Sequence, residues 1–181
     1  MNPHPRARLR RLLAAGLRPE DVPSPGPGQA SVWDYPRPPE LVPEPRRLRV
    51  VFGGRVIADT QEGLRLGETA SPPTYYFPPQ AIAAEVLQPS RHRSLCEWKG
   101  QARYFDVVAG GARAPNAAWS YPGARGPYEA LAGWIAFMPG LMEACYVGDE
   151  KARPQPGRFY GGWITDDLTG PFKGESGTLH W

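Results

Sequence analysis

Two residues of this sequence, Cys96 and Lys99, could do chemistry, because both side chains are potential nucleophiles and they lie close together. They belong to the stretch Ser94–Val108, whose pattern predicts a strand, a tight turn at Trp98–Gly100 and a returning strand. The positive charge of a neighbouring lysine lowers the pKa of a thiol and so favours the reactive thiolate. A lysine amine can also form a Schiff base or bind an anionic group. Cys96 and Lys99 are therefore the candidate catalytic residues.

A structural role explains the same two residues. Cys96 follows a leucine in an apolar strand, where a thiol is commonly buried and inert. Lys99 could be a solvated turn residue, or it could pair with Glu97 or Glu68. No histidine has an evident carboxylate partner in the sequence, so a Ser/His/Asp or Cys/His catalytic group is not predicted. The sequence thus contains no recognisable catalytic constellation, and we expect no cofactor.

Aromatic side chains supply the material for a binding groove around the Trp98–Gly100 turn. A tryptophan at a turn is best tolerated when its ring lines a cavity, and an ammonium near such rings can grip an anionic group. We expect Trp98 and Trp119 to converge on one groove, with Lys99 at its edge. Either Tyr75 or Tyr121 would form a further wall. The predicted ligand-binding residues are Trp98, Lys99, Trp119, Tyr75, Tyr121, Asn116 and Glu68.

The alternative for each of these rings is a place in the core, since a small β domain needs large side chains to fill it. This is our expectation for Trp134 and Tyr104. Asn116 could cap a turn instead of orienting a ligand. The function that fits the groove is binding of a small polar molecule or a peptide group. The alternatives are a small-molecule enzyme, such as a transferase or one that uses the thiol or amine, and an adaptor that binds nucleic acid or protein through the basic N-terminal segment.

The composition is typical of one core-bearing domain with extensions. The chain has 181 residues, and its 23 prolines and 21 glycines favour short strands and turns over long helices. The net charge is +3, but the arginine excess lies near the N-terminus, so we do not expect nucleic acid as a partner. No apolar run approaches the ~20 residues of a membrane span, and we expect a cytoplasmic protein without membrane contact.

The two cysteines, Cys96 and Cys145, lie far apart in sequence and form no C-x-x-C pair. This spacing argues against a disulfide scaffold and against a four-thiolate zinc site, so we expect no metal site. Free thiols in a reducing cytosol are the simplest interpretation.

Short apolar stretches between turn signals predict a mainly β domain. Gly53-Gly54 is a strong two-residue hairpin signal, and Pro72-Pro73 is expected to break a strand. A closing hairpin is expected around a turn at Pro139-Gly140. The expected strands are 48–52, 55–59, 64–68, 74–77, the two arms of Ser94–Val108, 112–121, 134–137 and 141–147, and the expected helices are 80–87 and 127–132.

The chain divides into four parts. We expect a basic helix and a flexible Pro/Gly linker over 1–28, an extended aromatic and prolyl arm over 29–46 and the β domain over 47–150. The C-terminal arm, 151–181, should pack on the domain because its aromatic side chains would otherwise expose an apolar patch. These side chains include Phe159, Tyr160, Trp163, Phe172 and Trp181.

Four motifs follow one another as Tyr75–Pro79, Cys96–Phe105, Ala118–Pro122 and Ala132–Pro139. Together they resemble the family called domain of unknown function 427, over about residues 47–150. The resemblance implies a β-tent, in which two small antiparallel meanders meet at a steep angle, with one or two short helices and Pro/Gly-rich arms. Related β-tents often hold zinc with two C-x-x-C pairs, so their absence here implies a zinc-free member.

The family sometimes carries a nucleotidyltransferase-like label. That chemistry would need paired carboxylates for Mg²⁺ or a Gly-rich turn that opens a helix, and the sequence has neither an Asp-x-Asp pair nor such a turn. The motifs of this sequence therefore do not support the label.

Overall fold

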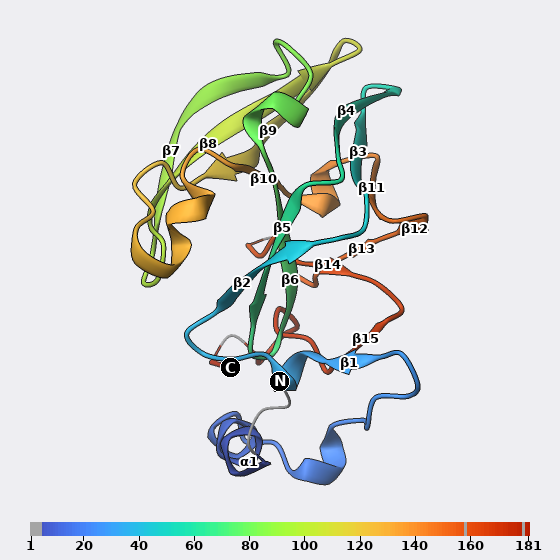
Figure 1. Ribbon diagram of the computed structural model, residues 1–181, viewed down its shortest axis with the longest axis vertical. Helices are drawn as coiled ribbons and strands as arrows, with labels where there is room; N and C mark the ends of the chain where they lie inside the picture. Colours follow the sequence, from blue (N-terminus) through green and yellow to red (C-terminus); the bar gives the residue numbers. More distant parts are fainter. Residues whose placement is uncertain (1–4, 158, 179) are drawn as a thin grey trace.

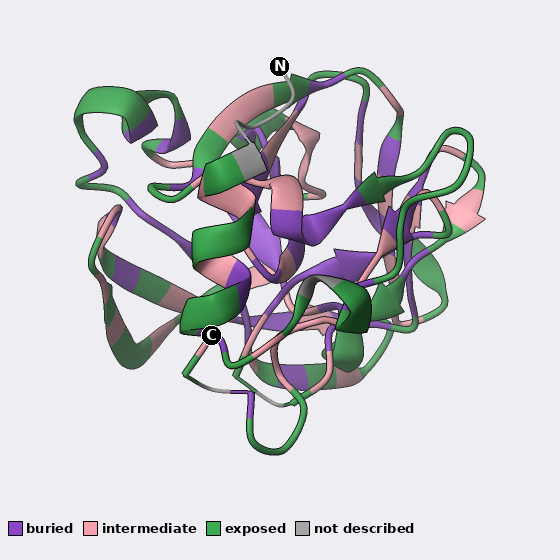
Figure 2. Cartoon of the chain, turned by 90° about the horizontal axis from the view of Figure 1, so that it is seen from below, coloured by how far each residue is buried: buried purple, intermediate pink, exposed green. Residues whose placement is uncertain are grey.

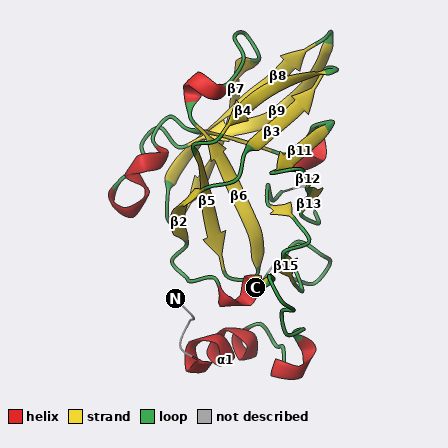
Figure 3. Cartoon of the chain, turned by 45° about the vertical axis from the view of Figure 1, so that its right-hand side comes forward, coloured by secondary structure: helices red, strands yellow, loops and turns green. Residues whose placement is uncertain are grey.

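Two antiparallel sheets form most of the molecule (Figure 1). The computed structural model describes residues 5–157, 159–178 and 180–181. The larger sheet has seven strands, in the spatial order β2 (Glu40–Glu44), β5 (Gly63–Glu68), β6 (Ser71–Phe77), β10 (Ile135–Phe137), β9 (Ala112–Ser120), β8 (Gly100–Ala109) and β7 (Leu87–Cys96). The smaller sheet has four, β12 (Glu150–Lys151), β11 (Ala144–Val147), β3 (Leu48–Phe52) and β4 (Arg55–Thr60). The predicted mainly β fold is confirmed, and Figure 3 shows how strands dominate it.

Shorter elements join the arms to these sheets. The strand β1 (Ala30–Ser31) pairs in parallel with β15 (Leu168–Thr169), and β13 (Arg153–Pro154) pairs with β14 (Trp163–Ile164). The helical segments of the described chain are α1 (Pro5–Ala14) and the 3₁₀ turns η1 (Pro19–Asp21), η2 (Val32–Asp34), η3 (Pro79–Ala81), η4 (Gly126–Leu131) and η5 (Pro139–Leu141). None of the described helices is both long and apolar enough to cross a membrane.

The β3–β4 hairpin forms where the sequence predicts it. Gly53 and Gly54 both have positive φ, 61° and 71°, which a two-residue turn of this type requires. A Cβ on Gly53 would overlap the carbonyl of Ala109, because this turn touches the β8–β9 turn. Side chains alternate along β3, with Leu48 and Val50 buried in the space between the two sheets.

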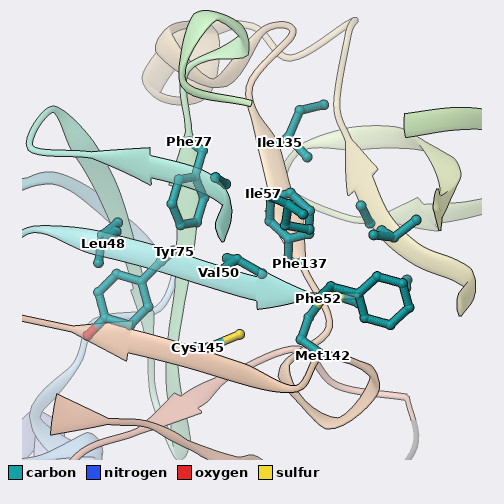
Figure 4. Packing of buried hydrophobic residues seen from close by; sticks show 14 of the residues in the cluster. Leu48, Val50, Phe52, Ile57, Tyr75, Phe77, Ile135, Phe137, Met142 and Cys145 are labelled. Carbon is teal, nitrogen blue, oxygen red and sulfur yellow. The ribbon is translucent and has the colours of Figure 1, made fainter. Parts of the chain in front are cut away.

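The main core lies between the two sheets (Figure 4). The rings of Phe77 and Phe137 meet edge to face, with their centroids 5.5 Å apart. Trp163 from the C-terminal arm is fully buried in the same cluster, 5.2 Å from the ring of Tyr75. The arm therefore contributes a central side chain to the core and not only a cover.

Three of the expected elements are wrong. The helix expected at 80–87 is a single 3₁₀ turn, η3, followed by an irregular segment, in which Ile82 bridges to Ala58 of β4 and a turn at 84–85 gives Glu85 a positive φ of 64°. Pro72-Pro73 lies inside β6, because the neighbouring strand β10 covers only Tyr76 and Phe77 and leaves the prolines at an open edge.

The closing hairpin is the third correction. Its two expected arms belong to different sheets, since β10 pairs with β6 and β9 whereas β11 pairs with β3 and β12. The turn η5 carries the chain from the large sheet to the small one. A Pro-Gly turn determines that the chain changes direction, but it does not determine which strand the next segment pairs with.

The described part of the N-terminal segment packs against the arm that follows it. The helix α1 ends at Ala14, and its Leu12 is buried in a small cluster with Val32 and Trp33 of η2. Figure 2 shows exposed and partly buried positions alternating along α1, of which Leu12 is buried. The amphipathic pattern of the helix explains this packing, because one apolar side must be covered.

Candidate ligand-binding site

A pocket of about 420 Å³ lies on one face of the seven-stranded sheet. Its floor is a row of directly paired residues, which must point to the same face. Tyr76 of β6 pairs with Ala136 of β10, Ala136 pairs with Trp119 of β9, and Trp119 pairs with Tyr104 of β8. Tyr76, Trp119 and Tyr104 all line the pocket, whereas the neighbouring Tyr75 points into the core on the opposite face.

Two segments form the walls over this floor. The turn between β7 and β8 contributes Trp98 and Lys99, and the C-terminal arm contributes Tyr160 and Gly161 among others. A Cβ on Gly161 would overlap the indole ring of Trp119, so the arm approaches the floor as closely as a glycine permits. The pocket is thus built from segments that are far apart in sequence.

Lys99 is the most unusual residue of the pocket. Its side chain is only 7% exposed, and its ammonium lies 5.2 Å from the ring centroid of Tyr121. Within the described residues, Lys99 has neither an ion pair nor a hydrogen bond. The alternative that it pairs with Glu97 does not hold, because Glu97 pairs with Arg37, with 2.9 Å between the charged atoms. A nearly buried cation therefore faces the pocket without a counter-ion.

The polar groups beside Lys99 are donors in their neutral form. Burial raises the pKa of Tyr121, and the nearby Cys96 and Tyr104 raise it further. Burial also raises the pKa of Tyr76 well above its ordinary value. The indole N–H of Trp98 is enclosed and finds no acceptor among the described residues. Beside Lys99 the pocket consequently offers positive charge and N–H and O–H groups, while of its two glutamates Glu97 is paired with Arg37 and Glu68 lies near Lys173.

Most of the residues predicted from the sequence come together in this pocket. They are Trp98, Lys99, Trp119, Tyr121, Glu68 and Cys96. Tyr104, which was expected in the core, also lines it. Glu68 and Lys173 lie on the same wall, where the charge of Glu68 opposes the lowering of the Lys173 pKa by burial.

Tyr75 and Asn116 are not in the pocket. Tyr75 is fully buried on the core face, where burial raises the pKa of its phenol. Asn116 has a positive φ of 53°, and its backbone N–H donates to the carboxylate of Asp106 over 2.8 Å. Its side-chain oxygen accepts a hydrogen bond from Ser90. Asn116 therefore shapes the irregular part of β9 and has a structural role.

Sequence reasoning missed three kinds of residue. Tyr76 replaces Tyr75, and a correct assignment of the two faces of β6 would have found it. Arg37 comes from the N-terminal arm, and Tyr160 and Lys173 come from the C-terminal arm. Lys173 carried a signal, because it is one of three lysines in an arginine-rich sequence.

The two thiols should differ strongly in reactivity. Cys145 is buried in the core, and burial raises the pKa of its thiol. Cys96 is half-buried and lines the pocket. We expect iodoacetamide to alkylate Cys96 at least about ten times faster than Cys145, because the thiolate is the nucleophile. Peptide mapping by mass spectrometry gives the two rates, with Cys96→Ser as the control, and faster labelling of Cys145 would contradict this arrangement.

No group of three or more His, Cys, Asp or Glu side chains with metal-ligating geometry occurs in the part of the chain that the structure describes. The polar groups around Lys99 are mainly ammonium, phenol, indole and thiol groups, and the carboxylates of the pocket, Glu68 and Glu97, lie near Lys173 and Arg37. Such a set suits an anionic organic group better than it suits a hard cation.

Comparison with known proteins identifies the family. The model of the domain of unknown function 427, which carries the label NTP_transf_9, matches residues 40–148. These residues include the β3–β4 and β7–β8 hairpins and the floor of the pocket, whereas the C-terminal arm that forms one wall lies outside them. The search of curated proteins gives no match. The chain belongs to the family of the domain of unknown function 427.

Proposed function

We propose that this protein binds a small polar ligand through an anionic group of that ligand, in the pocket between the seven-stranded sheet and the Trp98-Lys99 turn. The observation that carries the proposal is the environment of Lys99, whose ammonium is 7% exposed and unpaired within the described chain. Burying an unpaired charge costs free energy. An anionic ligand group would offset that cost. Without the ligand, the buried charge lowers the stability of the folded protein.

The rest of the pocket supports an organic ligand over a bare inorganic anion. The rings of Tyr76, Trp119 and Tyr104 form an apolar floor that suits a planar or aliphatic part of a molecule. The ammonium of Lys99 could donate a charge-assisted hydrogen bond to a carboxylate at the edge of this floor. The volume of the pocket, about 420 Å³, lies in the range of small-molecule sites.

A pair of isosteric probes tests this proposal. Isothermal titration calorimetry compares 3-phenylpropionate with 3-phenylpropionamide, which has the same shape and no charge. We expect the carboxylate to bind at least about tenfold more tightly, because a charge-assisted hydrogen bond contributes more than a neutral one. The preference should weaken only slightly when the salt concentration is increased, since Lys99 is shielded from solvent. Equal affinities, or binding of neither probe, would contradict the proposal.

A second candidate function is thiol chemistry at Cys96. It is favoured by one observation, namely that Cys96 lines the same pocket close enough to Tyr121 to affect the pKa of that phenol. In this function the anionic group would be held by Lys99 while an electrophilic carbon reaches the thiol. We place this chemistry in the cytoplasm, because both cysteines are free and a reducing environment keeps thiols free. Protection of Cys96 from iodoacetamide by 3-phenylpropionate would place the thiol beside the bound anion, and unchanged labelling would exclude it from contact.

A further inference from the structure

We propose that the anionic group bound at Lys99 is the carboxylate of an acidic side chain in an extended peptide segment, which lies along β7. This inference rests on the proposed function, because it assumes that Lys99 receives an anion. Beyond the proposed function, it names the chemical class of the ligand, an acidic peptide. Three features of β7 and the rim of the pocket carry it: an open backbone edge, unpaired positive charge and exposed apolar side chains.

The first feature is the open edge of the large sheet. β7 is the last strand in the spatial order of the sheet, and within the described chain only β8 pairs with it (Figure 1). Most of its side chains are at least partly exposed. An edge strand presents backbone N–H and C=O groups that can pair with an added strand. This is a common way in which a sheet binds an extended peptide.

The second feature is the charge of this edge. Arg91 and Arg93 of β7 are exposed, and Arg103 of β8 lies directly opposite Arg93. None of the three arginines has a carboxylate partner among the described residues. Arg93 instead donates to the backbone carbonyl groups of Ser90 and His92. Like charges directly opposite each other on neighbouring strands are unfavourable, and an acidic partner would relieve the repulsion.

The third feature is the apolar rim of the pocket. Leu95 of β7 is 82% exposed and Phe159 of the C-terminal arm is 73% exposed. These are the two most exposed large hydrophobic side chains of the described protein, and both line the pocket. Exposed apolar side chains beside a pocket mark a contact that extends beyond the pocket itself. A ligand that fills the pocket would cover only the parts of these side chains that face it.

Together these features favour a peptide over other polyanions. A nucleic acid would use the arginines through its phosphates, but it would gain little from Leu95 and Phe159. Arg93 and Leu95 are two positions apart on β7 and lie on the same side of the sheet, so an extended peptide that carries acidic residues followed by an apolar residue can use both. Leu95 lies four positions before Lys99 along the chain, so a peptide on β7 runs directly toward the pocket.

A capped peptide of the sequence Leu-Glu-Leu-Glu-Leu tests the inference against 3-phenylpropionate. We expect the peptide to bind the full-length protein at least about tenfold more tightly than the small probe, because it adds contacts at the rim. The peptide Leu-Gln-Leu-Gln-Leu should lose most of this affinity. The double variant Arg91→Gln/Arg93→Gln should weaken peptide binding about tenfold and leave the affinity for 3-phenylpropionate unchanged, since neither arginine lines the pocket.

Two controls keep the outcomes distinct. The double variant Arg10→Gln/Arg55→Gln removes the same charge from exposed positions elsewhere, and it should change neither affinity. If the peptide binds no more tightly than 3-phenylpropionate, the peptide inference is overturned while the proposed function stands. If a ten-residue oligothymidylate binds the arginines more tightly than the peptide, the assignment of the partner is wrong. If 3-phenylpropionate itself does not bind, the proposed function fails, and this inference fails with it.

Discussion

Replacing Trp163 with alanine should lower the free energy of unfolding by about 3–5 kcal/mol, the range for removal of a buried tryptophan. The side chain is fully buried against Tyr75 and Phe77. Its indole N–H donates to the carbonyl group of Phe137 over 3.2 Å. The substitution would therefore leave a large cavity and an unpaired carbonyl in the main core. Urea unfolding followed by circular dichroism measures the change.

The matched control comes from the same arm. Phe159→Ala removes an aromatic ring that is 73% exposed, and it should change the stability by less than about 0.5 kcal/mol. A Trp163→Ala protein with wild-type stability would show that the arm does not complete the core. Trp163 lies outside residues 40–148, which the family model matches, so the result also shows whether the matched segment contains its complete core. We expect the matched segment alone to fold poorly for the same reason.

The β3–β4 and β7–β8 hairpins could be predicted from the sequence because local chemistry determines their turns. Gly53 and Gly54 supply the positive φ values that the β3–β4 turn needs, and no distant residue is required to explain that turn. Gly100, with a φ of 83°, does the same at the Trp98-Lys99 turn. This is also why Trp98 and Lys99 were placed together correctly at one tip of a hairpin.

The faces of the strands could not be predicted in the same way. Tyr75 and Tyr76 are adjacent aromatic residues, and either could point to the core in a strand that is covered on both sides. The choice depends on pairing with β5 and β10, which the local sequence does not encode. An error of one residue moves a side chain to the opposite face, and for this reason Tyr75 was assigned to the pocket instead of Tyr76.

The helix expected at 80–87 failed for a tertiary reason. Ile82 and Val86 have a spacing that suits one side of a helix, but they lie against β4 and β8 in an irregular segment with a turn between them. Backbone hydrogen bonds from Ala83 to Ile57 and from Val108 to Val86 hold this segment beside the strands. Propensity over so few residues is a weak preference, and packing against two strands outweighs it.

Replacing Lys99 with methionine should abolish the preference for an anionic ligand without unfolding the protein. Methionine has nearly the length of lysine, so the packing against Tyr121 is preserved. The loss of the cation–π contact costs stability, whereas the removal of an unpaired buried charge favours the folded state. We therefore expect a free energy of unfolding within about 1 kcal/mol of wild type. A residue whose loss impairs binding but not stability belongs to a binding site.

Calorimetric titration of 3-phenylpropionate into Lys99→Met is the most direct test of the proposed site. The affinity should fall about 10- to 100-fold, which corresponds to the loss of one charge-assisted contact, while 3-phenylpropionamide binds as it does to wild type. Lys151→Met, which removes an exposed lysine from β12, should leave both affinities unchanged. If Lys99→Met binds the carboxylate as tightly as wild type does, Lys99 does not receive the anion and the proposed site is wrong.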